Sequence, residues 1–201
     1  MNWNDGVQYA IDVSSGNINV CKDVQLSCQR FLNQLERKDW RWEFRPEYVE
    51  HILKFVSMTK HIKGPAAGQK MELMPFQIMF LCAIYGFRDK QDNSKRMVQD
   101  VILFIPRKAS KSTLIAIISL YELLFGEVGS EIYCTAIDRN QASIVFDTAK
   151  GLIDTLPGQL SSQYMVYRHE IKKAKDGQTK FMALSRDSKK TGDGKNPSVS
   201  I

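Results

Sequence analysis

VILFIPRKASKST, residues 101–113, is the stretch on which the expected fold depends. Its first five residues are apolar, which predicts a buried strand over 101–105. A short polar loop follows at 106–110, and an apolar helix over 112–125 begins directly after it. A strand, a tight loop and a helix that begins with Lys-Ser/Thr are together typical of a phosphate-binding loop.

The expected helix start has the chemistry of an anion site. Backbone N–H groups in the first turn of a helix have no intrahelical acceptor, and the helix dipole favours negative charge there. Lys111 would reach the β- and γ-phosphates of a nucleotide, and the Ser112 hydroxyl would help to hold Mg²⁺. We therefore expect Lys111, Ser112 and the amides of 109–113 to line one site.

The stretch departs from the strict pattern G-x-x-x-x-G-K-[ST]. The two glycine positions are occupied by Ile105 and Ser110. Glycine in place of Ser110 would let the backbone bend and approach the phosphates closely. Because Lys-Ser-Thr is a common tripeptide, an ordinary helix start remains the alternative at this stage.

The composition is that of a globular chain. The length of 201 residues is enough for one α/β domain with a core, with or without a small appendage. The hydrophobic fraction of 43% and the charged fraction of 25% are ordinary for a globular protein. The net charge of +6 permits a polyanionic partner without requiring one. No apolar run is long enough to span a bilayer, so we expect a cytosolic protein without a membrane partner. The four cysteines form no C-x-x-C pair, which favours reduced thiols: Cys21, Cys28, Cys82 and Cys134.

The N-terminal part of the chain is expected to be helical. The polar composition of 2–20, with scattered aromatics and two glycines, predicts an extended arm or loop. The apolar periodicity then predicts helices over 24–37 and 46–62. The glycine- and proline-bearing segment 64–68 is the clearest boundary signal in the sequence. It predicts an arm and helical lid subdomain over 1–63 and a core over 64–201.

The core is expected to be an α/β sheet. Its helices are predicted over 78–87, 112–125 and 138–156, and its strands over 101–105, 131–136 and the last residues, 197–201. Alternation of strands and helices predicts a mostly parallel sheet flanked by helices, with 101–105 parallel to 131–136. The segments 163–168 and 179–184 flank Asp176-Gly177, which predicts a β-hairpin.

Several further motifs stand in order along the chain. They are YA with DVSSG (9–10, 12–16), LxPFQ (73–77), YxxA with NQA (133–136, 140–142) and GxGxNPS (192–198). With the Pro-Arg-Lys phosphate loop, this ordered set resembles the N-terminal ATPase region of the large terminase subunit of tailed bacteriophages. The resemblance implies a P-loop NTPase-type sheet with a helical lid. It also implies that the sheet is incomplete, because the acidic Walker B strand would follow Ile201.

The resemblance implies an activity and partners. It implies that ATP hydrolysis with Mg²⁺ drives translocation of double-stranded DNA into a procapsid. The implied partners are the portal of the procapsid, the small terminase subunit and further copies of the chain in a ring, all in the host cytoplasm. Without the acidic strand, residues 1–201 are expected to bind nucleotide weakly or not at all and to hydrolyse it negligibly.

The resemblance also implies roles for individual residues. Lys111 and Arg107 would be catalytic, with Arg107 stabilising charge on the γ-phosphate, and Ser112 would bind the metal. The implied nucleotide-binding residues are Phe76, Gln77, Arg107, Lys108, Ala109, Ser110, Lys111, Ser112 and Thr113. Each has a plainer alternative: a surface arginine for Arg107, a helix-start polar residue for Gln77 and a core aromatic for Phe76.

Basic residues beyond the phosphate loop are a second candidate set. The lysines of the C-terminal third could follow DNA phosphates or simply be solvated: Lys172, Lys173, Lys175, Lys180, Lys189, Lys190 and Lys195. Arg139 is a candidate for acting on a neighbouring subunit's nucleotide, although a surface arginine at a helix start is the plainer reading. Two other functions remain open: a different P-loop enzyme, such as a helicase or nucleotide kinase, and a non-catalytic piece that docks DNA or a portal.

Overall fold

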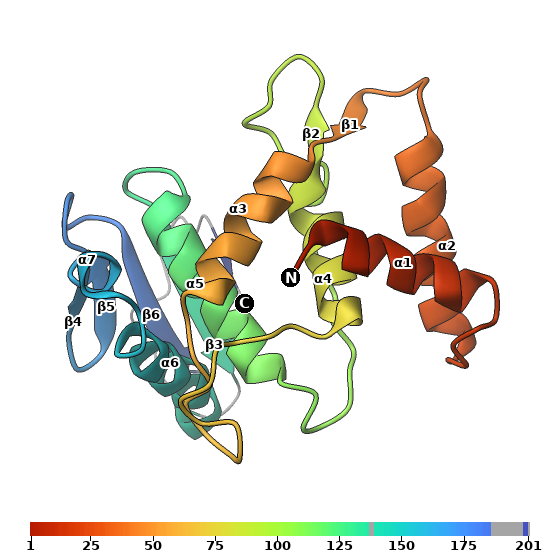
Figure 1. Ribbon diagram of the computed structural model, residues 1–201. Coiled ribbons are helices and arrows are strands. Elements are labelled where there is room, and N and C mark those ends of the chain that lie inside the picture. Colours follow the sequence, from red (N-terminus) through yellow and green to blue (C-terminus); the bar gives the residue numbers. More distant parts are fainter. Residues whose placement is uncertain (137–138, 186–198, 201) are drawn as a thin grey trace. The chain divides into compact units, whose positions relative to one another are not determined.

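The computed structural model describes residues 1–136, 139–185 and 199–200, with backbone only for 139–142 and 185 (Figure 1). The chain divides into two compact units. The first comprises Met1–Ser57 and Glu72–Phe104, and the second comprises Met58–Met71 and Ile105–Ile201. The division that the sequence predicts after Lys63 falls inside Met58–Met71 and stays a prediction.

The first unit is mainly helical. Its helices are α1 (Trp3–Ser14), α2 (Lys22–Glu36), α3 (Pro46–Ser57) and α4 (Pro75–Leu81), and α4 continues as the π-helix η1 (Cys82–Gly86). A short antiparallel ribbon of β1 (Trp42–Phe44) and β2 (Phe87–Asp89) completes it. Phe44 and Phe87 pack edge to face with centroids 5.3 Å apart. The expected helices over 24–37, 46–62 and 78–87 are thus confirmed, with shifted ends.

The expectation of an extended arm over 2–20 is wrong, because α1 occupies most of that segment. Asn2 and Asp5 form a capping box that satisfies amides at the helix start. Gly6 lets α1 approach α4 closely: a Cβ on Gly6 would lie 2.5 Å from the backbone nitrogen of Met79. The buried face of α1 is made of small residues, which gave no recognisable apolar periodicity.

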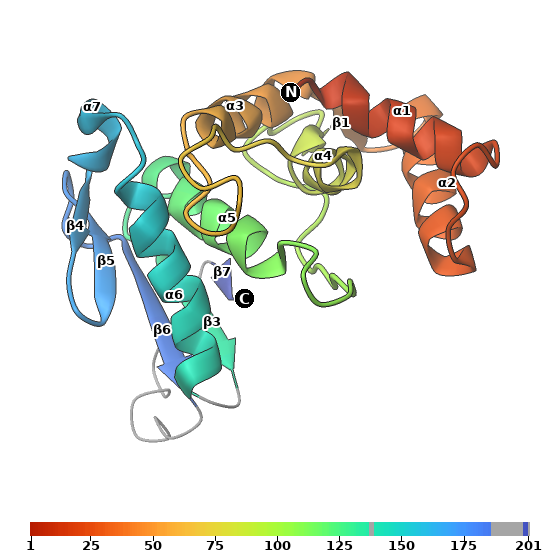
Figure 2. The same cartoon turned by 60° about the horizontal axis from the view of Figure 1, so that its bottom comes forward.

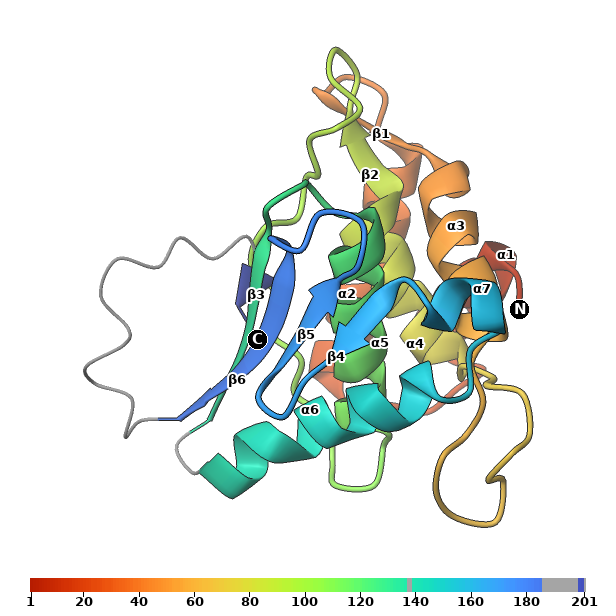
Figure 3. The ribbon, with the colours of Figure 1, turned by 90° about the vertical axis from the view of Figure 1, so that its left-hand side faces the viewer.

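The second unit contains a five-stranded sheet with the order β4-β5-β6-β3-β7 (Figures 2 and 3). The strands are β3 (Glu131–Ala136), β4 (Tyr164–Val166), β5 (Glu170–Lys173), β6 (Lys180–Ser185) and β7 (Val199–Ser200). β3 pairs in parallel with β6 and β7, whereas β4, β5 and β6 pair antiparallel. The sheet is therefore mixed, which corrects the mostly parallel sheet expected from the sequence.

Helices α5 (Lys111–Phe125) and α6 (Arg139–Ile153) pack against each other and against β3 and β6, and the short α7 (Gly158–Ser161) follows α6. Ile117 and Leu120 of α5 are fully buried, as are Ile132 of β3 and Phe181 of β6. Burial of this apolar surface between helices and sheet stabilises the unit. The α/β class expected from the sequence is confirmed.

Two expected elements of the core are wrong. Residues 101–105 form no strand, and Ile102 and Phe104 are 95% and 98% exposed. β3 pairs along its whole length with β6 on one side, and on the other side Ile132 and Tyr133 pair with β7, so 101–105 is not the neighbour of β3 that the sequence predicted. The hairpin of 163–168 with 179–184 is replaced by two turns, because β5 lies between β4 and β6.

Within the part of the chain that the structure describes, no helix combines the length and apolar character that crossing a bilayer requires.

Candidate nucleotide-binding site

The loop before α5 contains two residues in the left-handed region of backbone space. Lys108 has φ 69°, and Ser110, the N-cap of α5, has φ 55° and ψ 28°. This region disfavours residues with a Cβ by about 1–2 kcal/mol. Ser110 thus has a backbone conformation that glycine would adopt more easily. This agrees with the phosphate-loop pattern, which has glycine at this place.

The N-terminus of α5 presents backbone donors. The first helical hydrogen bond runs from the Leu114 N–H to the Ser110 carbonyl, at 3.0 Å. The Ser110 side chain makes no capping bond, and the amides of 111–113 donate to no residue that the structure describes. Three N–H groups at the positive end of a four-turn helix suit an anion.

Lys111 is the first residue of α5, and its side chain folds back over the loop. Its Nζ donates to the Ile105 carbonyl at 3.0 Å. This partner is neutral, so the ammonium charge is not cancelled by a carboxylate. A phosphate oxygen would be a stronger acceptor for Nζ, because charge-assisted hydrogen bonds are about twice as strong as neutral ones.

The charge of the segment also favours an anion. Arg107 and Lys108 are exposed, and neither forms an ion pair with a described residue. No Asp or Glu occurs between Asp100 and Glu122. The phosphate loop and most of α5 therefore carry three cations and no carboxylate.

Two hydroxyls stand at the same helix start. Ser112 and Thr113 are half-buried, and their side chains make no hydrogen bond to the described residues. A hydroxyl oxygen at this position fits one coordination place of Mg²⁺, which prefers oxygen ligands. Elsewhere in the described ranges, no three His, Cys, Asp or Glu side chains gather as a metal site.

Gln77 and Phe76 belong to the first unit, whereas the phosphate loop belongs to the second. Gln77 is 3% exposed, and its Oε1 accepts the Met74 N–H at 2.9 Å. This bond closes the start of α4, so Gln77 has the capping role that its plainer alternative predicts. Its side-chain amide nitrogen, Nε2, makes no hydrogen bond to a described residue, and the adenine role stays a prediction.

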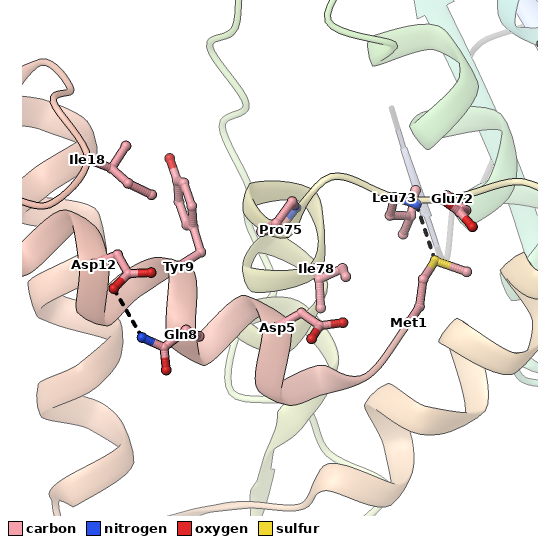
Figure 4. Close-up of a pocket in the computed structure, with 10 residues that line it drawn as sticks. All are labelled: Met1, Asp5, Gln8, Tyr9, Asp12, Ile18, Glu72, Leu73, Pro75 and Ile78. Carbon is pink, nitrogen blue, oxygen red and sulfur yellow. Dashed lines mark hydrogen bonds between the residues drawn. The ribbon is translucent and has the colours of Figure 1, made fainter.

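A pocket of about 440 Å³ lies in the first unit, between α1 and the segment leading into α4 (Figure 4). Sequence reasoning did not predict it, although Tyr9 and Pro75, which lie in its wall, belong to two of the quoted motifs. Asp5, Asp12 and Glu72 also line the pocket. Three carboxylates make it unsuitable for phosphates, in contrast to the cationic loop before α5.

Most of the described lysines on the C-terminal strands have partners inside the protein. Lys172 pairs with Glu170 at 3.0 Å, and Lys180 pairs with Glu131 at 2.6 Å. The Nζ of Lys173 donates to the Leu124 carbonyl at 2.7 Å. Of the remaining candidates, Lys175 is exposed; Lys189, Lys190, Lys195 and the Arg139 side chain lie outside the described residues.

The model of the family described as terminase large subunit, ATPase domain, matches residues 75–201. The chain belongs to this family. The resemblance predicted from the motifs is thereby confirmed for more than half of the chain.

Two comparisons, both with the large terminase of phage HK97, show how much of that protein the chain covers. The curated large terminase subunit of Enterobacteria phage HK97 is 33% identical over 111 residues, which cover 54% of this chain and 21% of that protein. The crystal structure of the HK97 bacteriophage large terminase superimposes with a TM-score of 0.60 at 28% identity, covering 76% of this chain and 30% of that one. The chain therefore spans about a fifth to a third of the HK97 large terminase.

Proposed function

We propose that this chain is the ATP-binding region of a DNA-packaging motor, in which ATP hydrolysis drives double-stranded DNA into a procapsid. The observation that supports it is the N-terminus of α5. The amides of 111–113, which donate to no described residue, and the Lys111 ammonium lie at this helix start. Arg107 and Lys108 precede it in the loop, and no carboxylate occurs in the sequence between Asp100 and Glu122. Family membership selects ATP among possible anions.

The roles of the loop residues follow from their positions. The amides of 111–113 bind phosphate oxygens, and Lys111 exchanges its bond to the Ile105 carbonyl for a phosphate oxygen. The Ser112 hydroxyl holds Mg²⁺, which when bound neutralises charge on the phosphates. Arg107, exposed and without a described ion pair, stabilises charge that develops on the γ-phosphate.

The remaining parts of the proposal rest on the family. A P-loop NTPase-type core with a helical lid binds ATP, and the side-chain amide NH2 of Gln77 and the ring of Phe76 contact the adenine. The partners are double-stranded DNA, the portal, the small terminase subunit and further copies of the chain in a ring, in the host cytoplasm. A helicase or a non-catalytic DNA-binding piece is less well supported, because the family match spans the phosphate loop.

We propose that residues 1–201 bind ATP weakly and turn it over negligibly. Hydrolysis needs a carboxylate to orient or deprotonate water, and losing that group costs about 10²- to 10⁴-fold in rate. Glu122 lies three turns along α5 from Lys111 and is buried. No carboxylate of the phosphate loop or α5 is therefore placed to face the γ-phosphate.

Binding of a fluorescent ATP analogue with Mg²⁺ tests this function. Lys111→Ala removes one charge-assisted hydrogen bond, worth about 1.5–3 kcal/mol, so we expect affinity to fall tenfold or more. Lys175→Ala, an equally charged change at an exposed position, is the control and should leave affinity within about twofold. Equal affinity of the two variants would contradict a nucleotide site at α5.

A further inference from the structure

The segment Met58–Met71, here called the basic loop, belongs to the second unit and has no part in the function proposed above. It contains three lysines and one histidine but no Asp or Glu. Lys60, Lys63 and Lys70 are all exposed. Figure 3 shows the loop, coloured gold, as an open excursion away from the sheet.

The base of the basic loop is firmly attached. Thr59 is fully buried and Met71 is 3% exposed, and the Met71 N–H donates to the Thr59 carbonyl at 3.0 Å. The Lys60 N–H donates to Oγ1 of Thr155 at 3.0 Å, which ties the loop to the segment after α6. Lys60 and Lys70 therefore project from backbone that is fixed by hydrogen bonds at the base of the loop.

The two lysines at the base face each other. Lys60 and Lys70 are partners in an antiparallel bridge. The bonds on either side run from the Met71 N–H to the Thr59 carbonyl and from the His61 N–H to the Gln69 carbonyl. This pattern makes Lys60 and Lys70 a non-hydrogen-bonded pair, the arrangement that brings cross-strand side chains closest.

Like charges directly opposite each other destabilise an antiparallel pair. Neither Lys60 nor Lys70 has an ion-pair partner among the residues that the structure describes, whereas Lys172 and Lys180 of the sheet each face a glutamate. An anion bound between the two ammonium groups would relieve the repulsion. The base of the loop is therefore arranged for a negatively charged ligand.

The tip of the basic loop allows close approach. Residues 64–68 are Gly-Pro-Ala-Ala-Gly, and both glycines have positive φ values, 79° and 85°. Apart from the adjacent residues, no described heavy atom lies within 4 Å of where a Cβ would stand on Gly64 or Gly68. Lys63 stands directly before this small, uncharged tip and is exposed.

We propose that the basic loop binds the phosphate backbone of double-stranded DNA through Lys60, Lys63 and Lys70. Only the choice of DNA among polyanions rests on the function proposed above. The loop has no Phe, Tyr or Trp on which the bases of a single strand could stack, and its one histidine, His61, is half-buried. It also lacks an exposed apolar anchor of the kind that dominates protein interfaces, since Ile62 is half-buried and lies beside Gly151. Lysines alone give binding that is independent of sequence and sensitive to salt.

The test measures the affinity of the 201-residue chain for a duplex oligonucleotide between 50 and 200 mM salt. Each phosphate contact contributes about 0.9 to the slope of log affinity against log salt. The variant K60A/K63A/K70A should therefore lower the slope by about 2.7 and lose at least tenfold in affinity at 50 mM salt. The control K22A/K38A/K54A removes the same charge from exposed positions of the first unit and should change the slope by less than about 1.

Two further arms separate the alternatives. K60R/K63R/K70R keeps the charges and should retain DNA binding, which excludes unfolding as the cause of a loss. Polyglutamate should displace the duplex less efficiently than unlabelled duplex at equal charge concentration, because its charge density is lower; equal or more efficient displacement by polyglutamate would indicate an acidic protein as the partner and overturn the proposal. Absence of duplex binding by the unmodified chain, or equal slopes for the two alanine variants, would also overturn it. Affinity for the ATP analogue, measured on the same variants, should be unchanged. Failure of the unmodified chain to bind the analogue would count against the nucleotide site, whereas a loss of duplex binding alone concerns the basic loop.

Discussion

Ser110 provides the sharpest test of the phosphate-loop conformation. Its φ of 55° and ψ of 28° place it in the left-handed region, where a residue with a Cβ is disfavoured by about 1–2 kcal/mol. Ser110→Gly removes this cost. Glycine loses more conformational entropy on folding, which opposes the gain by about 0.5–1 kcal/mol. We expect a net stabilisation of about 0.5–1 kcal/mol.

Urea unfolding monitored in the second unit measures this difference. Ser112→Gly is the matched control, because Ser112 lies in the first turn of α5 with helical geometry. Glycine within a helix is disfavoured by about 1 kcal/mol relative to alanine, so the control should be destabilised. Affinity for the ATP analogue should rise with Ser110→Gly, since the loop amides reach the phosphates with less strain. Destabilisation by Ser110→Gly equal to that of Ser112→Gly would refute a left-handed Ser110.

Two other predictions concern single contacts. Gly6→Ala should destabilise the first unit by about 1–3 kcal/mol in urea unfolding, because its Cβ would lie 2.5 Å from the Met79 nitrogen; Gly158→Ala, with open space around its Cβ, is the control and should be tolerated. Burial and the hydrogen bond to the Glu131 carboxylate raise the pKa of Tyr133 to about 12 from 10.0. A raised folded-state pKa gives stability that is complete below pH 10 and lost as the pH rises to 12, so the stability advantage of the unmodified chain over Tyr133→Phe should shrink in that window. A constant difference between pH 9 and 12 would show that Tyr133 does not titrate in this way.

The elements that the sequence predicted correctly have strong local signals. α3, α5 and β3 are long apolar or amphipathic runs whose burial follows from their own pattern. β5 was missed because three of its four residues are charged. In the structure, Lys172 pairs with Glu170 of the same strand, and Lys173 donates to the Leu124 carbonyl, which lies far away in the sequence. Segment 101–105 was misassigned for the opposite reason. Its residues are apolar and β-branched in part, but a strand also needs a hydrogen-bonding edge, which composition cannot reveal.

The candidate site, like the fold, was predictable from the sequence only in part. The position of Lys111 at the start of α5 followed from the loop–helix part of the pattern, although the strand expected before it is absent. The special backbone at Ser110 agrees with the glycine that the pattern has there. The bond from Lys111 to the Ile105 carbonyl depends on how the loop folds back, which local sequence does not specify. The capping role of Gln77 and the like-charge pair of Lys60 and Lys70 likewise depend on backbone geometry.

The exposure of segment 101–105 has a consequence for handling the protein. VILFI is an uncharged run with high β-propensity, and its Ile102 and Phe104 side chains are almost fully in solvent. Such a run is a template for strand-to-strand association between molecules, so aggregation should increase steeply with protein concentration. Asp100 on one side and Pro106-Arg107 on the other act as gatekeepers that oppose this association. The loop arginine thus contributes to colloidal stability as well as to the charge of the phosphate loop, and Arg107→Ala is expected to increase light scattering before any effect on nucleotide binding is seen.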